Sequence, residues 1–213
     1  MTNKPLFLYV CKMNTQALIL FVRNPQLGKV KTRLAKTIGN QKALQVYQYL
    51  LQHTHQITQN LHQVDKFLYY ADALNHEDLW QNDRYHKAMQ DQTPDLGQRM
   101  QHAFGQCFNK KYEKVMIIGS DCAQLTQKII EEAYQHLDQN DVALGKALDG
   151  GYYLLGMKKL HKDLFINKQW STETVAQDTI ADCQKNNLSI AFLPTLSDID
   201  QEEDLKTIPN FQL

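Results

Sequence analysis

Residues 115–122 read Val-Met-Ile-Ile-Gly-Ser-Asp-Cys, and this stretch decides the fold. An uninterrupted apolar run that ends in a turn signal is typical of a strand buried on both faces, as in parallel sheets. Residues 126–137 follow with apolar side chains at helical spacing. Asp121 therefore lies at the carboxyl end of a buried strand, where open α/β sheets bind their ligands. Position alone predicts a metal ligand and a side chain that caps its own turn equally well.

Strand and helix patterns alternate through the rest of the chain. Apolar runs predict further strands at residues 17–22, 66–71, 141–144, 152–156 and 188–193. Apolar spacing predicts helices at residues 42–59 and 96–108, one capped by Ser171 or Thr172 that runs to 185, and a short one at 202–208. Residues 75–94 are expected to form a loop with a short helix and a short strand near 86–90. This order predicts one α/β domain over residues 1–213 with a mainly parallel sheet, and residues 1–14 as an extension that can be flexible, with Met13 as an alternative start.

The composition is that of an ordinary globular protein. Of 213 residues, 43% are hydrophobic and 22% are charged, and 23 basic residues balance 23 acidic ones. This balance argues against a nucleic-acid partner, which usually requires a basic excess. No apolar run is long enough to span a membrane, and residues 5–11 make a poor signal peptide. The four cysteines are widely separated, which predicts a reduced, cytoplasmic protein in which Cys122 serves packing.

The loop after the first predicted strand, residues 24–33, carries three basic side chains. Gly28 permits a tight turn, and Lys29, Lys31 and Arg33 follow it. Backbone N–H groups and guanidinium groups both suit phosphate, so the loop is a candidate anion cradle. It matches neither a Walker A motif nor a dinucleotide fingerprint. A solvated basic loop is the alternative.

Two later segments are ambiguous when taken singly. Asp149-Gly150-Gly151-Tyr152 permits a close approach of a ligand to the backbone, although a simple turn between two strands explains the glycines better. Asp198 and Asp200 are equally compatible with a shared metal ion and with a polar turn. The eight histidines show no metal-ligand spacing.

Taken in order, these segments and two others resemble one family. The motifs are Pro-x-x-Gly-x-x-Lys-Thr-Arg-Leu at residues 25–34, Asp-Leu-Gly-x-Arg-Met at 95–100, Gly-Ser-Asp-Cys at 119–122, Asp-Gly-Gly-Tyr-Tyr-Leu-x-Gly at 149–156, Trp-Ser-Thr at 170–172 and Asp-Ile-Asp at 198–200. This series resembles the DUF2064 family, the selenodomain/arsenosugar-associated glycosyltransferase-like proteins of bacteria. The resemblance covers about residues 15–208. It implies a GT-A, nucleotide-diphospho-sugar transferase fold, which is a three-layer α/β/α sandwich.

The resemblance also implies roles for individual residues. Gly28, Lys31, Thr32 and Arg33 would bind the nucleotide and its phosphates, and Leu96, Gly97 and Arg99 would line the nucleotide pocket. Asp121 would hold Mg²⁺ or Mn²⁺, with Asp200 and Asp198 completing the metal site. Asp149, Gly150, Gly151 and Tyr152 would face the transferred group or the acceptor, and Trp170 and Ser171 would join the substrate site. The chain departs from the family pattern at Ala123 and near Lys146, where the family has proline.

The expected function is metal-dependent transfer of a sugar from a nucleotide-activated donor to a small-molecule acceptor. Lys31 and Arg33 would offset the charge that grows on the leaving diphosphate. Asp149 would orient the acceptor or act as a base, a base being required only if the reaction inverts the sugar. The first alternative is a nucleotidyltransferase of the cofactor-guanylyltransferase type, which attacks the α-phosphate of a nucleoside triphosphate and releases pyrophosphate. The second is a noncatalytic nucleotide-binding module.

Overall fold

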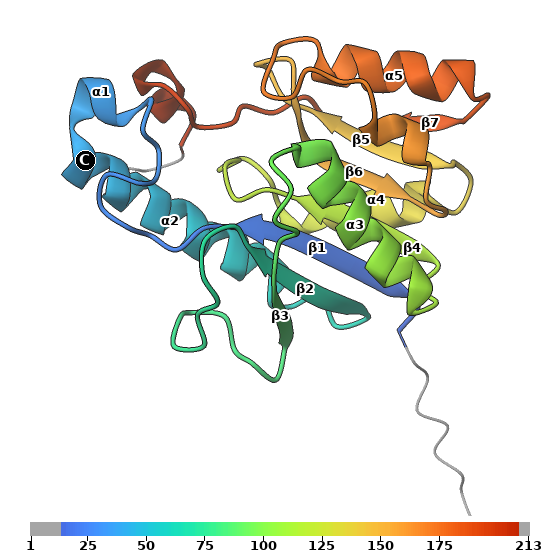
Figure 1. Cartoon of the computed structure of the whole chain (residues 1–213), viewed down its shortest axis with the longest axis horizontal. Coiled ribbons are helices and arrows are strands. Elements are labelled where there is room, and N and C mark those ends of the chain that lie inside the picture. The colour runs from blue at the N-terminus through green and yellow to red at the C-terminus, as the bar shows by residue number, and fades with distance from the viewer. Residues whose placement is uncertain (1–13, 209–213) are drawn as a thin grey trace, which may run out of the picture.

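The computed structural model describes residues 14–208 and contains one seven-stranded sheet (Figure 1). Its spatial order is β3-β2-β1-β4-β6-β5-β7. The strands are β1 (Gln16–Val22), β2 (Val64–Tyr70), β3 (Tyr85–Met89), β4 (Lys114–Ile118), β5 (Val142–Lys146), β6 (Tyr152–Met157) and β7 (Ile190–Phe192). Strand β6 runs antiparallel to its neighbours β4 and β5, whereas the other pairings are parallel. The predicted mainly parallel α/β sheet is therefore confirmed.

Helices cover both faces of this sheet and make three layers (Figure 1). Helices α2 (Asn40–Thr58) and α4 (Gln127–His136) pack on one face. Helices α3 (Leu96–Asn109) and α5 (Val175–Lys185) pack on the other, together with the 3₁₀ helix η1 (Lys162–Phe165). The remaining short elements are α1 (Ala35–Ile38) and the 3₁₀ helix η2 (Glu202–Thr207).

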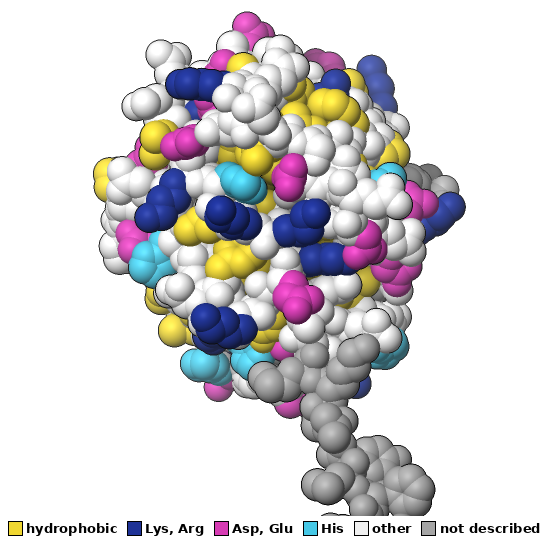
Figure 2. Space-filling view, turned by 90° about the vertical axis from the view of Figure 1, so that its right-hand side faces the viewer, with side chains coloured by type: hydrophobic (Ala, Val, Ile, Leu, Met, Phe, Trp, Pro, Cys, Tyr) yellow, Lys and Arg dark blue, Asp and Glu magenta, His cyan; other side chains and the backbone are white. Residues whose placement is uncertain are grey.

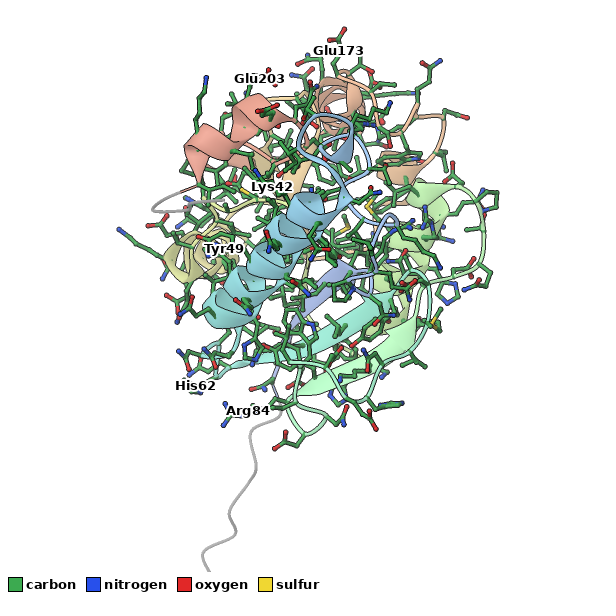
Figure 3. The ribbon with its side chains drawn as sticks, turned by 90° about the vertical axis from the view of Figure 1, so that its left-hand side faces the viewer. Lys42, Tyr49, His62, Arg84, Glu173 and Glu203 are labelled. Carbon is green, nitrogen blue, oxygen red and sulfur yellow. The ribbon has the colours of Figure 1, made fainter. Side chains whose placement is uncertain are left out.

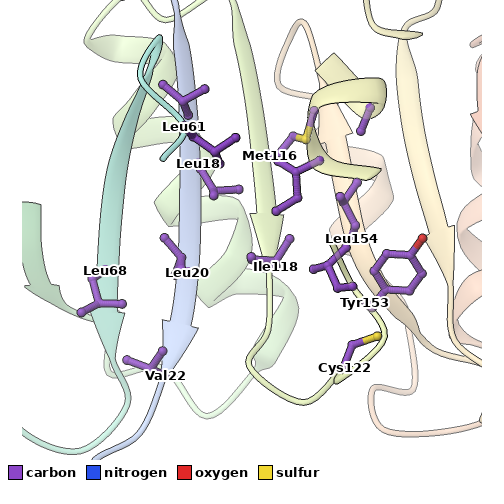
Figure 4. Close-up of a cluster of buried hydrophobic side chains, with 14 of the residues drawn as sticks. Leu18, Leu20, Val22, Leu61, Leu68, Met116, Ile118, Cys122, Tyr153 and Leu154 are labelled. Carbon is purple, nitrogen blue, oxygen red and sulfur yellow. The ribbon is translucent and has the colours of Figure 1, made fainter. Parts of the chain in front are cut away.

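Strand β1 shows how the sequence builds both cores at once. Its side chains alternate between the two faces, as in any pleated strand. Leu18, Leu20 and Val22 face the α2/α4 layer and pack beside Met116 and Ile118 of β4 (Figure 4). The intervening Ala17 and Ile19 belong to the core under α3 and α5. Because every one of these positions is apolar and buried, the strand has no solvent face, as its sequence predicts.

The C-terminal segment returns to the end of β4. A third apolar cluster joins Leu34 and Val46 to Ile199 and Ile208. The backbone N–H of Ile199 donates to the carbonyl of Asp121 at 2.9 Å, which places residues 198–200 beside the Gly-Ser-Asp turn. Figure 3 shows the same return at η2, where Glu203 lies near the start of α2, marked by Lys42.

The structure corrects two local expectations. Residues 75–84 form no helix, because the carboxylate of Asp78 instead accepts hydrogen bonds from Tyr70, Lys87 and the backbone of Trp80. Helix α5 begins at Val175 behind Thr174 rather than behind Ser171 or Thr172. Ser171 has a φ of 64°, a left-handed conformation that cannot open a right-handed helix.

Other expectations are confirmed or fall outside the description. The segment around Gly150 is the turn between β5 and β6, and the strand expected near 86–90 is β3. The final helix is present as the 3₁₀ helix η2. The N-terminal extension and the alternative start at Met13 fall almost entirely outside the described residues. Across residues 14–208, no helix is long and apolar enough to cross a membrane. Figure 2 shows basic and acidic side chains interspersed over one face.

Candidate functional site

A cavity of about 810 Å³ opens at the carboxyl ends of β1, β2 and β4. Open α/β sheets bind ligands at this edge, because the loops that leave parallel strands diverge there. Three of the four arginines of the chain line the cavity, namely Arg23, Arg33 and Arg99. The acidic side chains in its wall are Asp121, Asp149, Glu173, Asp198 and Asp200. The cavity therefore carries both basic and acidic side chains, and it lies at the sheet edge where the sequence places Asp121.

A charged cluster of Lys31, Arg33, Asp121 and Asp200 forms one end of the cavity. The Lys31 side chain is 4% exposed, and its Nζ lies 2.6 Å from Oδ1 of Asp121 and 3.3 Å from Oδ1 of Asp200. Nη1 of Arg33 lies 3.3 Å from the other oxygen of Asp200. Burial by itself lowers the pKa of Lys31, but Asp121 and Asp200 outweigh it and hold that pKa above its ordinary value. Lys31 is therefore an ammonium ion shared by two carboxylates.

Asp198 lies at the same end and experiences excess negative charge. Burial, together with the neighbouring carboxylates of Asp121 and Asp149, raises the pKa of Asp198 to about 7, although Lys31 acts in the opposite direction. By contrast, burial raises the pKa of the Cys122 thiol to about 12. Cys122 therefore stays protonated and packs in the α2/α4 core.

The carboxylates fit a divalent cation in a limited way. One carboxylate oxygen of Asp121 and one of Asp200 converge on the same position, which Lys31 Nζ occupies. Mg²⁺ and similar hard cations commonly take one or two protein carboxylates and fill the remaining positions with phosphate oxygens and water. Within residues 14–208, no three His, Cys, Asp or Glu side chains gather closely enough to hold a metal by themselves. Asp198 therefore does not complete a three-carboxylate site in this arrangement.

The β5–β6 turn brings Asp149 to the cavity. Its Oδ1 accepts a hydrogen bond of 2.9 Å from the backbone N–H of Gly151, which fixes the carboxylate. Gly150 has a φ of 89°, and a Cβ there would lie 1.9 Å from the carbonyl oxygen of Glu173. Gly150 therefore supports the turn and does not line the cavity, whereas Gly151 and Tyr152 do.

The first turn of α3 supplies the opposite wall. Leu96 and Arg99 line the cavity together with Trp170. Gly97 is buried beneath this wall, because a Cβ there would lie 2.3 Å from the carbonyl oxygen of Phe165 and 2.5 Å from the Trp170 ring. Gly97 therefore permits close packing and has no surface for a ligand.

Comparison with known proteins shows the family to which the chain belongs. A model of the family described as an uncharacterized protein conserved in bacteria, DUF2064, matches residues 54–172. This chain belongs to the DUF2064 family. The crystal structure of a protein from Desulfovibrio desulfuricans, provisionally named a nucleotide-diphospho-sugar transferase, is similar to this DUF2064 chain at 32% identity and a TM-score of 0.83. The match covers 93% of this chain and 87% of that one.

More distant solved structures share only the fold of this DUF2064 protein. The 4-diphosphocytidyl-2C-methyl-D-erythritol synthase from Anaerococcus prevotii matches at 11% identity and a TM-score of 0.56, over 92% of this chain and 96% of that one. The manganese complex of the Rv0371C protein from Mycobacterium tuberculosis matches at 10% identity and a TM-score of 0.54, over 91% and 97%. No curated protein sequence matches the chain. The predicted nucleotide-diphospho-sugar transferase fold is thereby confirmed.

The structure brings most of the predicted site residues of this DUF2064 chain together. Those that line the cavity are Lys31, Thr32, Arg33, Leu96, Arg99, Asp121, Asp149, Gly151, Tyr152, Trp170, Ser171, Asp198 and Asp200. Gly28, Gly97 and Gly150 lie outside its lining, and the last two serve packing instead. The two positions that depart from the family pattern, Ala123 and Lys146, pack against neighbouring elements and do not line the cavity. Ala123 is buried against α2, and Lys146 lies over the Phe192 ring at 5.9 Å.

Sequence reasoning missed several residues of the cavity wall. Tyr47 comes from the middle of α2, and its hydroxyl accepts a hydrogen bond of 2.9 Å from the backbone N–H of Arg23. Gln90 follows β3 and is buried, although it is polar. The helical stripe of α2 identifies Tyr47 as a buried residue but not as a wall of the site. No sequence signal identifies Gln90, because its partners Tyr69 and Arg99 belong to other elements of the fold.

Proposed function

We propose that this protein is a metal-dependent transferase that uses a nucleotide-activated donor, specifically a glycosyltransferase with a nucleotide-sugar donor. The observation that carries the proposal is the charged cluster, in which Lys31 and Arg33 face Asp121 and Asp200 within one cavity. Two cations beside two carboxylates suit a diphosphate bound together with a hard metal ion. The name of the D. desulfuricans relative, at 32% identity, supports the sugar donor.

The residues of the cluster would divide the work. Asp121 and Asp200 would hold the cation at the point where their oxygens converge. When bound, a divalent cation offsets the charge that develops on the leaving diphosphate. Lys31 would then move from the carboxylates to the phosphate oxygens, and the exposed Arg33 would reach the outer phosphate. The cluster thus supplies positive charge where the leaving group needs it.

Asp149 would act on the acceptor side. The hydrogen bond from Gly151 fixes one carboxylate oxygen, and the other oxygen is left to orient an acceptor hydroxyl or to accept its proton. Asp149→Asn keeps an oxygen for the Gly151 bond but removes the charge. We therefore expect this variant to bind nucleotide as the wild type does and to lose turnover.

The test is thermal stabilisation by UDP-, GDP- and ADP-sugars and by the nucleoside triphosphates, each with and without Mn²⁺ or Mg²⁺. A ligand at 100 times its Kd stabilises by about 2.7 kcal/mol, which raises the Tm of a chain of this size by roughly 5–10 °C. We expect such a shift with a nucleotide sugar only when metal is present. Asp121→Asn should abolish the metal dependence. Asp138→Asn, which alters a carboxylate paired with Lys114 at 2.5 Å outside the cavity, should leave it unchanged.

The outcomes separate the candidate functions. Release of pyrophosphate from a nucleoside triphosphate would favour the nucleotidyltransferase. Stabilisation by nucleotides without any turnover of sugar or triphosphate donors would favour a noncatalytic module. If no nucleotide shifts the Tm with either metal, both enzyme functions are wrong.

A further inference from the structure

Arg99 differs from the other cations that are held in the wall of the cavity. Lys31 and Arg33 each pair with a carboxylate of the charged cluster. Arg99 is half-buried, and within residues 14–208 it pairs with no carboxylate. Its Nε is buried and has no hydrogen-bond partner in the same range. A guanidinium group that is held at a cavity wall without a counter-charge is available to hydrogen-bond acceptors of a ligand.

Gln90 fixes the direction in which Arg99 points. The Gln90 side chain is buried, and its Nε2 donates to the carbonyl oxygen of Tyr69 at 3.3 Å. This bond orients the amide so that its Oε1 accepts from Nη1 of Arg99 at 3.0 Å. One guanidinium nitrogen is therefore held by a neutral acceptor that is itself held by β2. We call these two residues the Arg99 pair.

Apolar and aromatic side chains line the cavity together with the Arg99 pair. Leu96, Met100, Tyr152, Trp170 and Phe21 line the same cavity. Aromatic and apolar walls with a few oriented polar groups are typical of pockets that bind flat organic rings. Gln90 follows β3 and Asp121 follows β4, so three strand spacings, roughly 14 Å, separate the Arg99 pair from the charged cluster. An extended nucleoside diphosphate can span this distance, with its base at Arg99 and its phosphates at Lys31.

We propose that Arg99 binds the base of the nucleotide donor and selects guanine and uracil, which carry a carbonyl oxygen (O6 and O4) at the ring position where adenine and cytosine carry an amino group. The proposal rests on the proposed function, because it requires a nucleotide in this cavity. Arginine has only donors, so a carbonyl oxygen at the ring edge satisfies it. The amino group that adenine and cytosine carry at the corresponding position is also a donor and leaves Arg99 unsatisfied. Gln90 is a positioning residue, since it acts through Arg99.

The experiment measures the Kd of GDP, UDP, ADP and CDP by calorimetry at fixed Mg²⁺ and salt. For the wild type we expect GDP and UDP to bind at least about 10-fold more tightly than ADP and CDP. Arg99→Met removes the donors and should erase this preference by weakening GDP and UDP alone. Gln90→Met leaves Arg99 in place but unanchored. It should reduce the preference several-fold and leave the affinity for inorganic pyrophosphate unchanged.

Arg23→Met is the matched control. Arg23 also lines the cavity but is exposed, and its link to Tyr47 uses only its backbone. This variant should weaken all four nucleotides to the same extent. Equal weakening of all four by Arg99→Met would mean that Arg99 contacts phosphate, and this result would overturn the inference alone. Equal binding of the four nucleotides by the wild type would also overturn it. If no nucleotide binds the wild type, the proposed function and this inference are both wrong.

Discussion

The charged cluster and the Arg99 pair occupy one cavity but hold positive charge in different ways. In the cluster, Lys31 is shared by two carboxylates, so its charge is already compensated. In the Arg99 pair, the cation is held by a neutral amide and keeps its charge. A cation that is already paired with carboxylates can exchange them for an anionic ligand, but it discriminates little between ligands of different shape. An oriented, uncompensated guanidinium favours one geometry of acceptors. Under the proposed function, we therefore expect the first region to supply affinity for phosphate and the second to supply selectivity for the base.

The largest expected effect tests the packing behind the Arg99 pair. Gly97→Ala would place a Cβ 2.3 Å from a backbone oxygen of Phe165, which no rotamer change can relieve. We expect the free energy of unfolding to fall by about 3 kcal/mol and the Tm by roughly 6–12 °C in a calorimetric scan.

Gly119→Ala is the corresponding change beside the charged cluster. A Cβ at Gly119 meets no atom within 4 Å, and its φ is not positive. We expect its free energy of unfolding to stay within about 0.5 kcal/mol of the wild type. Equal Tm values for the two variants would show that the two ends of the cavity do not differ in packing.

The second prediction tests the charged cluster itself. Lys31→Met removes the ammonium and keeps the length of the buried stem. A charge-assisted hydrogen bond contributes about 1.5–3 kcal/mol, so the Kd for a nucleoside diphosphate should rise about 10- to 100-fold in a calorimetric titration. Lys168→Met is the control, because Lys168 is also buried and lies 2.5 Å from Asp182 but outside the cavity. An unchanged Kd in Lys31→Met would mean that the charged cluster does not bind the phosphates.

The smallest expected effect contrasts the cavity edge with the opposite edge of the sheet. Asp141, just before β5, accepts hydrogen bonds from the backbone N–H and the hydroxyl of Ser189, which lower the pKa of Asp141. The unfolded chain therefore binds more protons than the folded one below about pH 4, and stability is lost as the pH falls through that range. Asp141→Asn should lower the free energy of unfolding by about 1 kcal/mol at pH 7 and not at all well below pH 3.

Nucleotide affinity provides the contrast for Asp141→Asn. Because Asp141 lies outside the cavity lining, the variant should bind a nucleoside diphosphate as the wild type does at pH 7. A changed Kd would mean that charges at the two edges of the sheet are not independent. A stability difference that persists undiminished at low pH would show that the ionised carboxylate is not what Ser189 stabilises.

Much of the fold follows from local pattern. The apolar runs of β1 and β4 predict buried strands because both faces of these strands are covered by helices. The motif order predicts the DUF2064 family, and thirteen of its sixteen predicted site residues line one cavity. The starts of helices were harder to predict. Ser171 is a good N-cap by residue type, yet its left-handed backbone delays the helix to Val175. A left-handed backbone at a serine is not encoded by the residue type, so the sequence gives no sign of it.

The sequence by itself determined the alternation of strands and helices, the place of Asp121 at a strand end and the cationic loop around Lys31. These features depend on residues that are close together in the chain. Only the tertiary structure decided that Asp121 and Asp200 would share Lys31, although Asp200 is 169 residues from it in the chain. Only the tertiary structure decided, likewise, that Gln90 would anchor Arg99. Whether a charged side chain has a partner depends on which strand ends the sheet order places side by side. Residue types therefore predict a site, and packing determines which of its charges are free to bind.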